Sequence, residues 1–163
     1  MSKPIAGGSL HGTPRPTLEN TGTDYVAIFK SLDAQLRWQS ENPDVAGVAG
    51  LDEIYVPGTT AHDGQVGQTQ ILINTHHRWA DDNYRLISVD VKQVVQKPAP
   101  MVSLRVVDQQ DDEKVVDATG VQFGPIRPHG SPMASNIVLT PDAYGRWRIE
   151  DARLAIDDPT VQL

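Results

Sequence analysis

Cysteine is absent from all 163 residues of this chain. Without thiols, neither a disulfide framework nor a thiolate metal site can form. Cationic residues are scarce as well, because Lys and Arg number 14 against 21 Asp and Glu, for a formal net charge of -7. Proteins that bind a phosphate backbone need concentrated positive charge. The sequence therefore argues against nucleic acid as a partner.

Long apolar runs and short signature motifs are also missing. No stretch of about twenty apolar residues occurs, so no transmembrane segment is expected. Glycine-rich nucleotide-binding patterns, the Gly-x-Ser-x-Gly of serine hydrolases and the histidine spacings of zinc sites are all lacking. The acidic stretch from Asp108 to Asp117 lacks the alternating ligands and the glycine of a calcium loop. We therefore expect no metal and no cofactor.

The organisation of the chain is that of one domain with short extensions. A length of 163 residues with 39% hydrophobic content fits a single soluble globular domain. Residues 1–20 are rich in glycine and proline and lack the apolar core of a signal peptide, which predicts a flexible leader or a docking arm. Residues 21–155 form the predicted domain, and residues 156–163 form a polar tail.

The first half of the domain is predicted to be helical. Between Thr21 and Ser40, apolar residues recur at spacings of three and four, with Thr23 or Asp24 as the cap at the start. Pro43 ends this helix and begins a shorter one with a weaker stripe. The apolar stripe of the first helix consists of Tyr25, Ile28, Phe29, Leu32 and Leu36.

A third helix is expected after a break at Val56-Pro57-Gly58. Residues 59–67 are predicted to form a connector, and the helix is predicted to run from Val66 to Ala80. Asp81-Asp82-Asn83 is expected to end it. Asp63 would cap this helix at its start.

The second half of the domain changes to a period of two, which is typical of half-buried strands. Ile87, Val89 and Val91 alternate with polar residues, and residues 101–108 show the same pattern. An acidic turn at 109–113 is predicted to lead into a strand over 114–123, as in a meander. After a proline-rich connection over 124–135, residues 136–140 and 146–154 are predicted to pair across a turn at 141–145. Helices followed by antiparallel strands predict an α+β domain in which the helices cover one face of a curved sheet.

Three features of the chain are the aromatic stripe of the first helix and the stretches Ile54-Tyr55-Val56-Pro57-Gly58-Thr59-Thr60-Ala61 and Tyr144-Gly145-Arg146-Trp147-Arg148-Ile149-Glu150-Asp151. With these features the chain resembles the nuclear transport factor 2-like (NTF2-like), or cystatin-like cone, superfamily. The resemblance covers about Asp24 to Leu154. It is strongest to uncharacterised exported and lipoprotein domains of actinobacteria, from which this chain departs in lacking a lipobox cysteine. The larger assembly to which such a protein would belong is predicted to be an envelope-associated complex, a secretion machine or a virion.

The resemblance implies a cavity between helices and sheet. Some members bind small apolar ligands there, and others act as isomerases, dehydratases or epoxide hydrolases. Catalytic members place a His with a carboxylate, or an Asp-Arg-Asp arrangement, inside the cavity, because proton transfer needs hydrogen-bond reach. The sequence alone places no such pair.

Histidines and aromatic residues are the candidate site residues, and each has a structural interpretation. His76 and His77 are adjacent, so on a helix they would diverge by about 100° and could not face one pocket together. His62-Asp63 is an acid/base dipeptide in the predicted connector, and His129 lies in the proline-rich loop. Most aromatic residues are expected to pack the core. The ligand-pocket candidates are Tyr25, Phe29, Tyr55, His77, Trp79, Phe123 and Trp147.

Two functions are predicted. The first is a non-catalytic binding or interaction domain with protein partners, as a subunit of a homo-oligomer or of a larger assembly. The alternative is a small-molecule pocket protein, or an isomerase- or hydrolase-type enzyme, that uses the cone cavity for a small apolar ligand. A buried carboxylate or His within reach of a second titratable group would favour the alternative.

Overall fold

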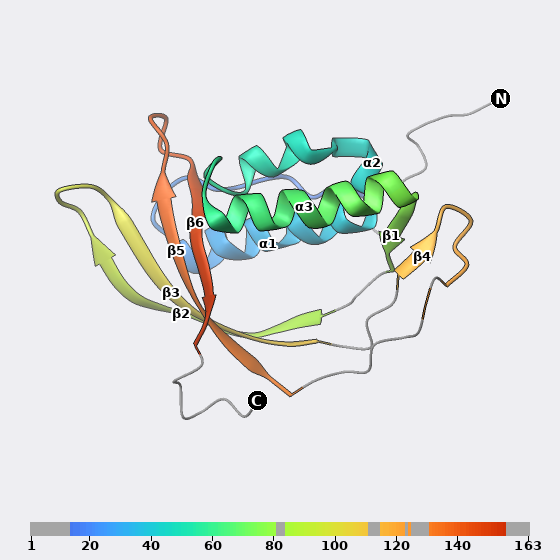
Figure 1. The fold of residues 1–163 in the computed structure, drawn as a ribbon. Coiled ribbons are helices and arrows are strands. Elements are labelled where there is room, and N and C mark those ends of the chain that lie inside the picture. The colour runs from blue at the N-terminus through green and yellow to red at the C-terminus, as the bar shows by residue number, and fades with distance from the viewer. Residues whose placement is uncertain (1–13, 81–83, 111–114, 123, 125–130, 156–163) are drawn as a thin grey trace.

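The computed structural model describes residues 14–80, 84–110, 115–122, 124 and 131–155, and Figure 1 shows the helices gathered over one face of a curved sheet. The predicted α+β class, with helices packed on a curved antiparallel sheet, is confirmed. The helices are α1 (Tyr25–Glu41), α2 (Pro43–Ala46), the 3₁₀ helix η1 (Val48–Glu53) and α3 (Thr60–Thr75). The strands are β1 (His77–Trp79), β2 (Tyr84–Val95), β3 (Met101–Gln110), β4 (Val115–Asp117), β5 (Met133–Pro141) and β6 (Trp147–Leu154).

Helix α1 begins where the sequence predicts a cap. The Asp24 carboxylate accepts a hydrogen bond from the Ala27 backbone N–H at 3.1 Å, which satisfies one of the exposed donors at the start of the helix. The helix ends at Glu41, and Pro43 opens α2 as predicted. Ile28, Phe29 and Leu32 of α1 are buried in one cluster with Val102 and Leu104 of β3, so the helix packs its apolar stripe on the sheet.

Helix α3 lies earlier in the chain than predicted. It begins at Thr60, so the prediction of a connector over residues 59–67 is wrong. The Thr59 hydroxyl caps the helix by accepting from the His62 N–H at 3.2 Å, and Asp63 is not the cap. Gly64 and Gly67 lower the intrinsic helix propensity, but contacts with η1 and β6 override it.

The same helix also ends earlier than predicted. His76 takes the left-handed conformation (φ 57) that commonly ends helices, and the next residues form β1. The predicted stop at residues 81–83 lies outside the described residues.

The main sheet has four antiparallel strands in the order β2-β3-β5-β6. The predicted pairing of β5 with β6 is confirmed, and so is the turn between them. The predicted meander is wrong at its third strand, because β4 covers only three residues and pairs with β1 in a separate two-stranded sheet. The Asp117 carboxylate accepts from the N–H groups of Thr119 and Val121, so the chain turns there and the strand ends.

The core lies between α1 and the concave face of the sheet. Alternate residues of β3 point inward, and Val102, Leu104 and Val106 are at most 3% exposed. Trp147 and Ile149 on β6 are buried in the same core, whereas Glu150 is exposed, which confirms the predicted alternation of this strand.

Residues 14–20, the described part of the predicted leader, lie against the domain. The Arg15 guanidinium stacks over the Trp38 ring at 5.0 Å, and the Glu19 N–H donates to the Ser31 hydroxyl at 2.8 Å. The Trp147 backbone N–H donates to the Asn20 carbonyl at 2.8 Å, and the Asn20 side-chain amide donates to the Trp147 carbonyl at 2.9 Å. These two hydrogen bonds link the segment before α1 to the first residue of β6. This segment therefore joins the helical layer to the last strand. The domain limits at residues 20 and 155 stay predictions.

Candidate functional site

A cavity of about 310 Å³ lies between α1 and the concave face of the sheet. Its wall is mostly apolar, because it is formed by inward-facing residues of the amphipathic helix and of the strands. Four polar side chains interrupt this wall: Asp33, Tyr55, Asp108 and Ser135. The apolar wall includes Phe29, Leu36, Leu86, Val106, Ile137 and Ile149.

Asp33 stands on the buried face of α1, one turn after Phe29. Its side chain is only 10% exposed, and its carboxylate accepts a hydrogen bond from the Arg37 guanidinium at 3.0 Å. A carboxylate in such a position needs a partner, because removing an unpaired charge from water is costly. Arg37 lies one further turn along the helix and supplies that partner.

Asp108 approaches the same region from β3. It continues the inward alternation of Leu104 and Val106, and it is half-buried. Burial raises the pKa of its carboxyl group, and the negative charge of Asp33 raises that pKa further, while Arg37 acts in the opposite direction. Among the described residues, no hydrogen bond or ion pair reaches the Asp108 carboxylate.

Tyr55 is a third polar side chain of the wall. It is 7% exposed, and its backbone is held by a bridge to Ile149 of β6. Burial, and then the charge of Asp33, raise the pKa of its hydroxyl, so the hydroxyl stays protonated at neutral pH. Within the part of the chain that the structure describes, this hydroxyl has no hydrogen-bond partner. The cavity thus contains a donor and a carboxylate that a ligand could engage.

Two of the seven predicted pocket residues line this cavity, namely Phe29 and Tyr55. Tyr25 and Trp147 instead pack edge to face at 5.3 Å, and the Trp147 indole N–H donates to the Gly22 carbonyl at 3.2 Å. These two rings therefore belong to the core, not to the cavity wall.

The other three predicted residues lie elsewhere or cannot be placed. His77 lines a separate hollow of about 160 Å³ together with His76 and Arg78, so the expectation that the two histidines could not face one pocket is wrong. That expectation assumed a continuous helix, whereas His76 ends α3 and His77 begins β1. Trp79 is half-buried in β1, where it pairs with Val115 of β4. Phe123 lies outside the described residues. The structure does not bring His77 or Trp79 to the cavity between α1 and the sheet.

The sequence interpretation missed Asp33 and Asp108, although each carries a signal. Asp33 falls on the apolar stripe of α1, four residues after Phe29. Asp108 follows Val102, Leu104 and Val106 at the spacing of two that marks one face of a strand. An acidic residue at an inward position is the pattern that could have identified them.

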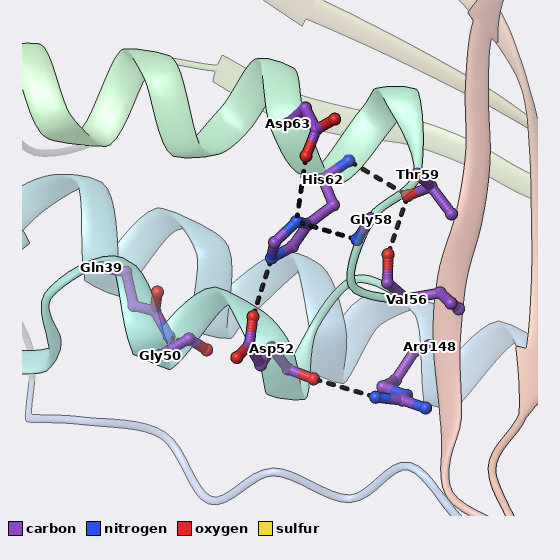
Figure 2. A network of polar contacts seen from close by, with 9 residues as sticks. All are labelled: Gln39, Gly50, Asp52, Val56, Gly58, Thr59, His62, Asp63 and Arg148. Carbon is purple, nitrogen blue, oxygen red and sulfur yellow. Dashed lines mark hydrogen bonds and ion pairs between the residues drawn. The ribbon is translucent and has the colours of Figure 1, made fainter.

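A second polar cluster, shown in Figure 2, joins η1, α3 and β6 outside the cavity wall. His62 contacts the Asp52 carboxylate at 2.7 Å, closer than the 3.6 Å to its neighbour Asp63. The Gly58 N–H donates to the other ring nitrogen of His62 at 3.4 Å, and Arg148 donates to the Asp52 carbonyl at 3.2 Å. The partner of His62 is therefore a residue ten positions earlier in the chain, and the cluster ties three elements together.

No protein-family model matches the chain, and no curated protein matches it significantly. Solved structures resemble it distantly. The intermembrane space region of the chloroplast protein ARC6 shares 9% identity over 83% of this chain and 98% of that one, with a TM-score of 0.48. Aln2 from a Streptomyces species shares 10% identity over 83% and 93%, with a TM-score of 0.49.

A third structure, from Catenulispora acidiphila and in complex with S-DNPA, shares 9% identity over 82% of this chain and 93% of that one, with a TM-score of 0.49. Likeness at this level says nothing about what this chain binds. The layers and the strand order define an α+β protein in which helices cover one face of a curved antiparallel sheet. Among the described residues, no helix is long and apolar enough to cross a membrane.

Proposed function

We propose that this protein binds a small, mostly apolar molecule in the cavity between α1 and the sheet. The observation that carries the proposal is an apolar wall that presents two polar groups, the Tyr55 hydroxyl and the Asp108 carboxylate, without partners among the described residues. Ligand sites are usually concave and mostly apolar, with a few polar groups that orient the ligand. A volume of about 310 Å³ is at the small end of such sites.

Structural roles account less well for this arrangement. A polar group that is buried without a partner costs free energy, so proteins usually pair such groups or replace them with apolar side chains. Here one inward position of β3 holds an acid where Val would continue the pattern. A ligand that engages Tyr55 and Asp108 would supply hydrogen bonds that no described residue supplies. Asp33 and Asp108 also supply a carboxylate pair, so isomerase- or hydrolase-type proton transfer is a natural extension of this proposal.

The direct test is to block the cavity. Ala152 lines the cavity at an exposed position, so Ala152→Phe places a ring at the mouth through which the ligand would enter. We expect cyclohexylmethanol, followed by ligand-observed NMR, to bind the unsubstituted protein saturably and to lose at least about tenfold in affinity for this variant.

Ala118→Phe is the matched control, because Ala118 is an exposed residue outside the cavity wall. This variant should bind cyclohexylmethanol like the unsubstituted protein. Equal binding by both Phe variants would argue against the cavity as the site.

An interaction domain is the second candidate, and strand β2 favours it. β2 is an edge strand of twelve residues, and its hairpin with β3 extends past the helices (Figure 1). Ile87, Val91 and Val94 on β2 are 41–50% exposed. Exposed edges can pair with another chain, but two register shifts and Lys92 weaken β2 as a template. Light scattering after size-exclusion chromatography would support this candidate by showing a dimer, and a monomer at all concentrations would count against it.

A further inference from the structure

The charges around the cavity do not balance. Two carboxylates, those of Asp33 and Asp108, influence one another, and Arg37 is the cation that acts on both. Arg37 forms its ion pair with Asp33 at 3.0 Å. The Asp108 carboxylate receives no ion pair from any residue in the described ranges. One negative charge beside the apolar wall is thus left without a close counter-charge.

The chemistry of a ligand that would balance this charge can be stated. An alcohol could donate one hydrogen bond to Asp108 but would leave its charge uncompensated. A carboxylate ligand would add a third negative charge and would be repelled. A protonated amine donates charge-assisted hydrogen bonds, which are stronger than neutral ones, and it neutralises Asp108.

Tyr55 provides a second, independent indication that a ligand with a polar group occupies the cavity. Its side chain is more than nine-tenths buried, lines the cavity and ends in a hydroxyl with no partner in the described part of the chain. A hydroxyl both donates and accepts, so it can contact a polar group held at Asp108 or a neighbouring acceptor on the same ligand. The apolar body would lie against Phe29, Val106 and Ile149.

We propose that the ligand of this cavity is an amine, with a compact apolar body of about one ring and a single protonated nitrogen that pairs with Asp108. This inference rests on the proposed function, because it names the ligand class of the same cavity. Asp108 is assigned as the residue that selects the amine, and Arg37 keeps Asp33 engaged so that Asp33 does not compete for it.

Three probes of one shape test the assignment on the full chain: cyclohexylmethylamine, cyclohexylmethanol and cyclohexanecarboxylate, titrated by calorimetry at pH 7.5. We expect the amine to bind about tenfold more tightly than the alcohol, since hydrogen bonds to charged groups are worth more than neutral ones. The carboxylate should bind most weakly. If the alcohol or the carboxylate binds as tightly as the amine, the amine assignment is overturned while the cavity proposal stands. If none of the three binds, both proposals fail.

Substitution of the selecting residue sharpens the test. Asp108→Asn keeps the shape of the side chain and removes its charge, so the preference for the amine over the alcohol should disappear. Asp90→Asn is the matched control, because Asp90 is an exposed aspartate of β2 outside the cavity wall. It should keep the full preference. Retention of the amine preference by Asp108→Asn would overturn the role given to Asp108.

Discussion

At the scale of single residues, Asp108 is an acid at an inward position of β3 where an apolar side chain would be more stable. Its neighbours on the inward face of β3 are Val102, Leu104 and Val106, all buried and apolar. An acid in this series is disfavoured by burial and by Asp33, which is why its pKa is raised. Acids whose pKa is raised by burial are enriched at binding and catalytic sites.

Stability should therefore depend on pH through Asp108. A raised pKa in the folded state means that the full stability is present below the ordinary Asp pKa of about 4, and part of it is lost as pH rises through the folded value. Asp108→Asn has no such loss. The melting temperature of this variant, relative to that of the unsubstituted protein, should therefore rise between pH 4 and pH 7. Thermal melts across this range measure the difference, and a difference that stays constant with pH would contradict the burial of the carboxyl.

Trp147 illustrates the opposite case, a residue used for the core alone. It is 8% exposed and packs edge to face on Tyr25, so Trp147→Ala should lower the free energy of unfolding by about 3 kcal/mol. Tyr144 is 82% exposed on the preceding turn, and Tyr144→Ala should change stability by less than about 0.5 kcal/mol. Urea denaturation compares the two, and similar losses would contradict the distinction between them.

The residue scale also separates what the sequence could predict from what it could not. The burial of Trp147 followed from its alternation with Arg146 and Arg148, which is a local pattern. Asp33 and Asp108 are 75 positions apart, and only the packing of α1 on β3 brings them to one cavity. Local patterns mark each as an inward acid but cannot show that they meet.

At the scale of elements, helix α3 depends on its cap more than on its composition. Two glycines within its first eight residues weaken it, and the Thr59 hydroxyl both accepts from the His62 N–H and donates to the Val56 carbonyl at 2.8 Å. Thr59→Ala should therefore lower the free energy of unfolding by about 1 kcal/mol. Thr60→Ala replaces an exposed residue at the first helical position by the best helix former and should cause no loss of stability; equal losses in urea denaturation would rule out the capping role.

Predictions from the spacing of apolar residues succeed for some elements and fail for strand β4. Helix α1, the β5–β6 hairpin and the turn at residues 141–145 were predictable, because each rests on local spacing or on turn residues. The short strand β4 was not, since its partner β1 lies almost forty residues earlier and the Asp117 turn ends it after three residues. Pairing across such a distance is decided by tertiary packing.

At the scale of the whole molecule, one helical layer on one curved sheet leaves room for a cavity, and the N-terminal segment helps to hold the layers together. Residues 15–20 contact α1, and Asn20 is bonded to Trp147 at the start of β6. The fold class was predictable from the order of helices and strands. The use of the cavity was not, because the fold alone does not specify function.

The position of a bound ligand in the whole molecule is the most direct test of the proposed binding cavity. Intermolecular nuclear Overhauser effects between bound cyclohexylmethanol and the isotope-labelled protein locate the ligand without a substitution. Binding in the cavity predicts contacts from the ring protons to the methyl groups of Val106 and Ile137, which line it. Contacts to the exposed methyl groups of Ile87 and Val91 on β2 instead, or saturable binding at neither place, would contradict a small-molecule site between α1 and the sheet.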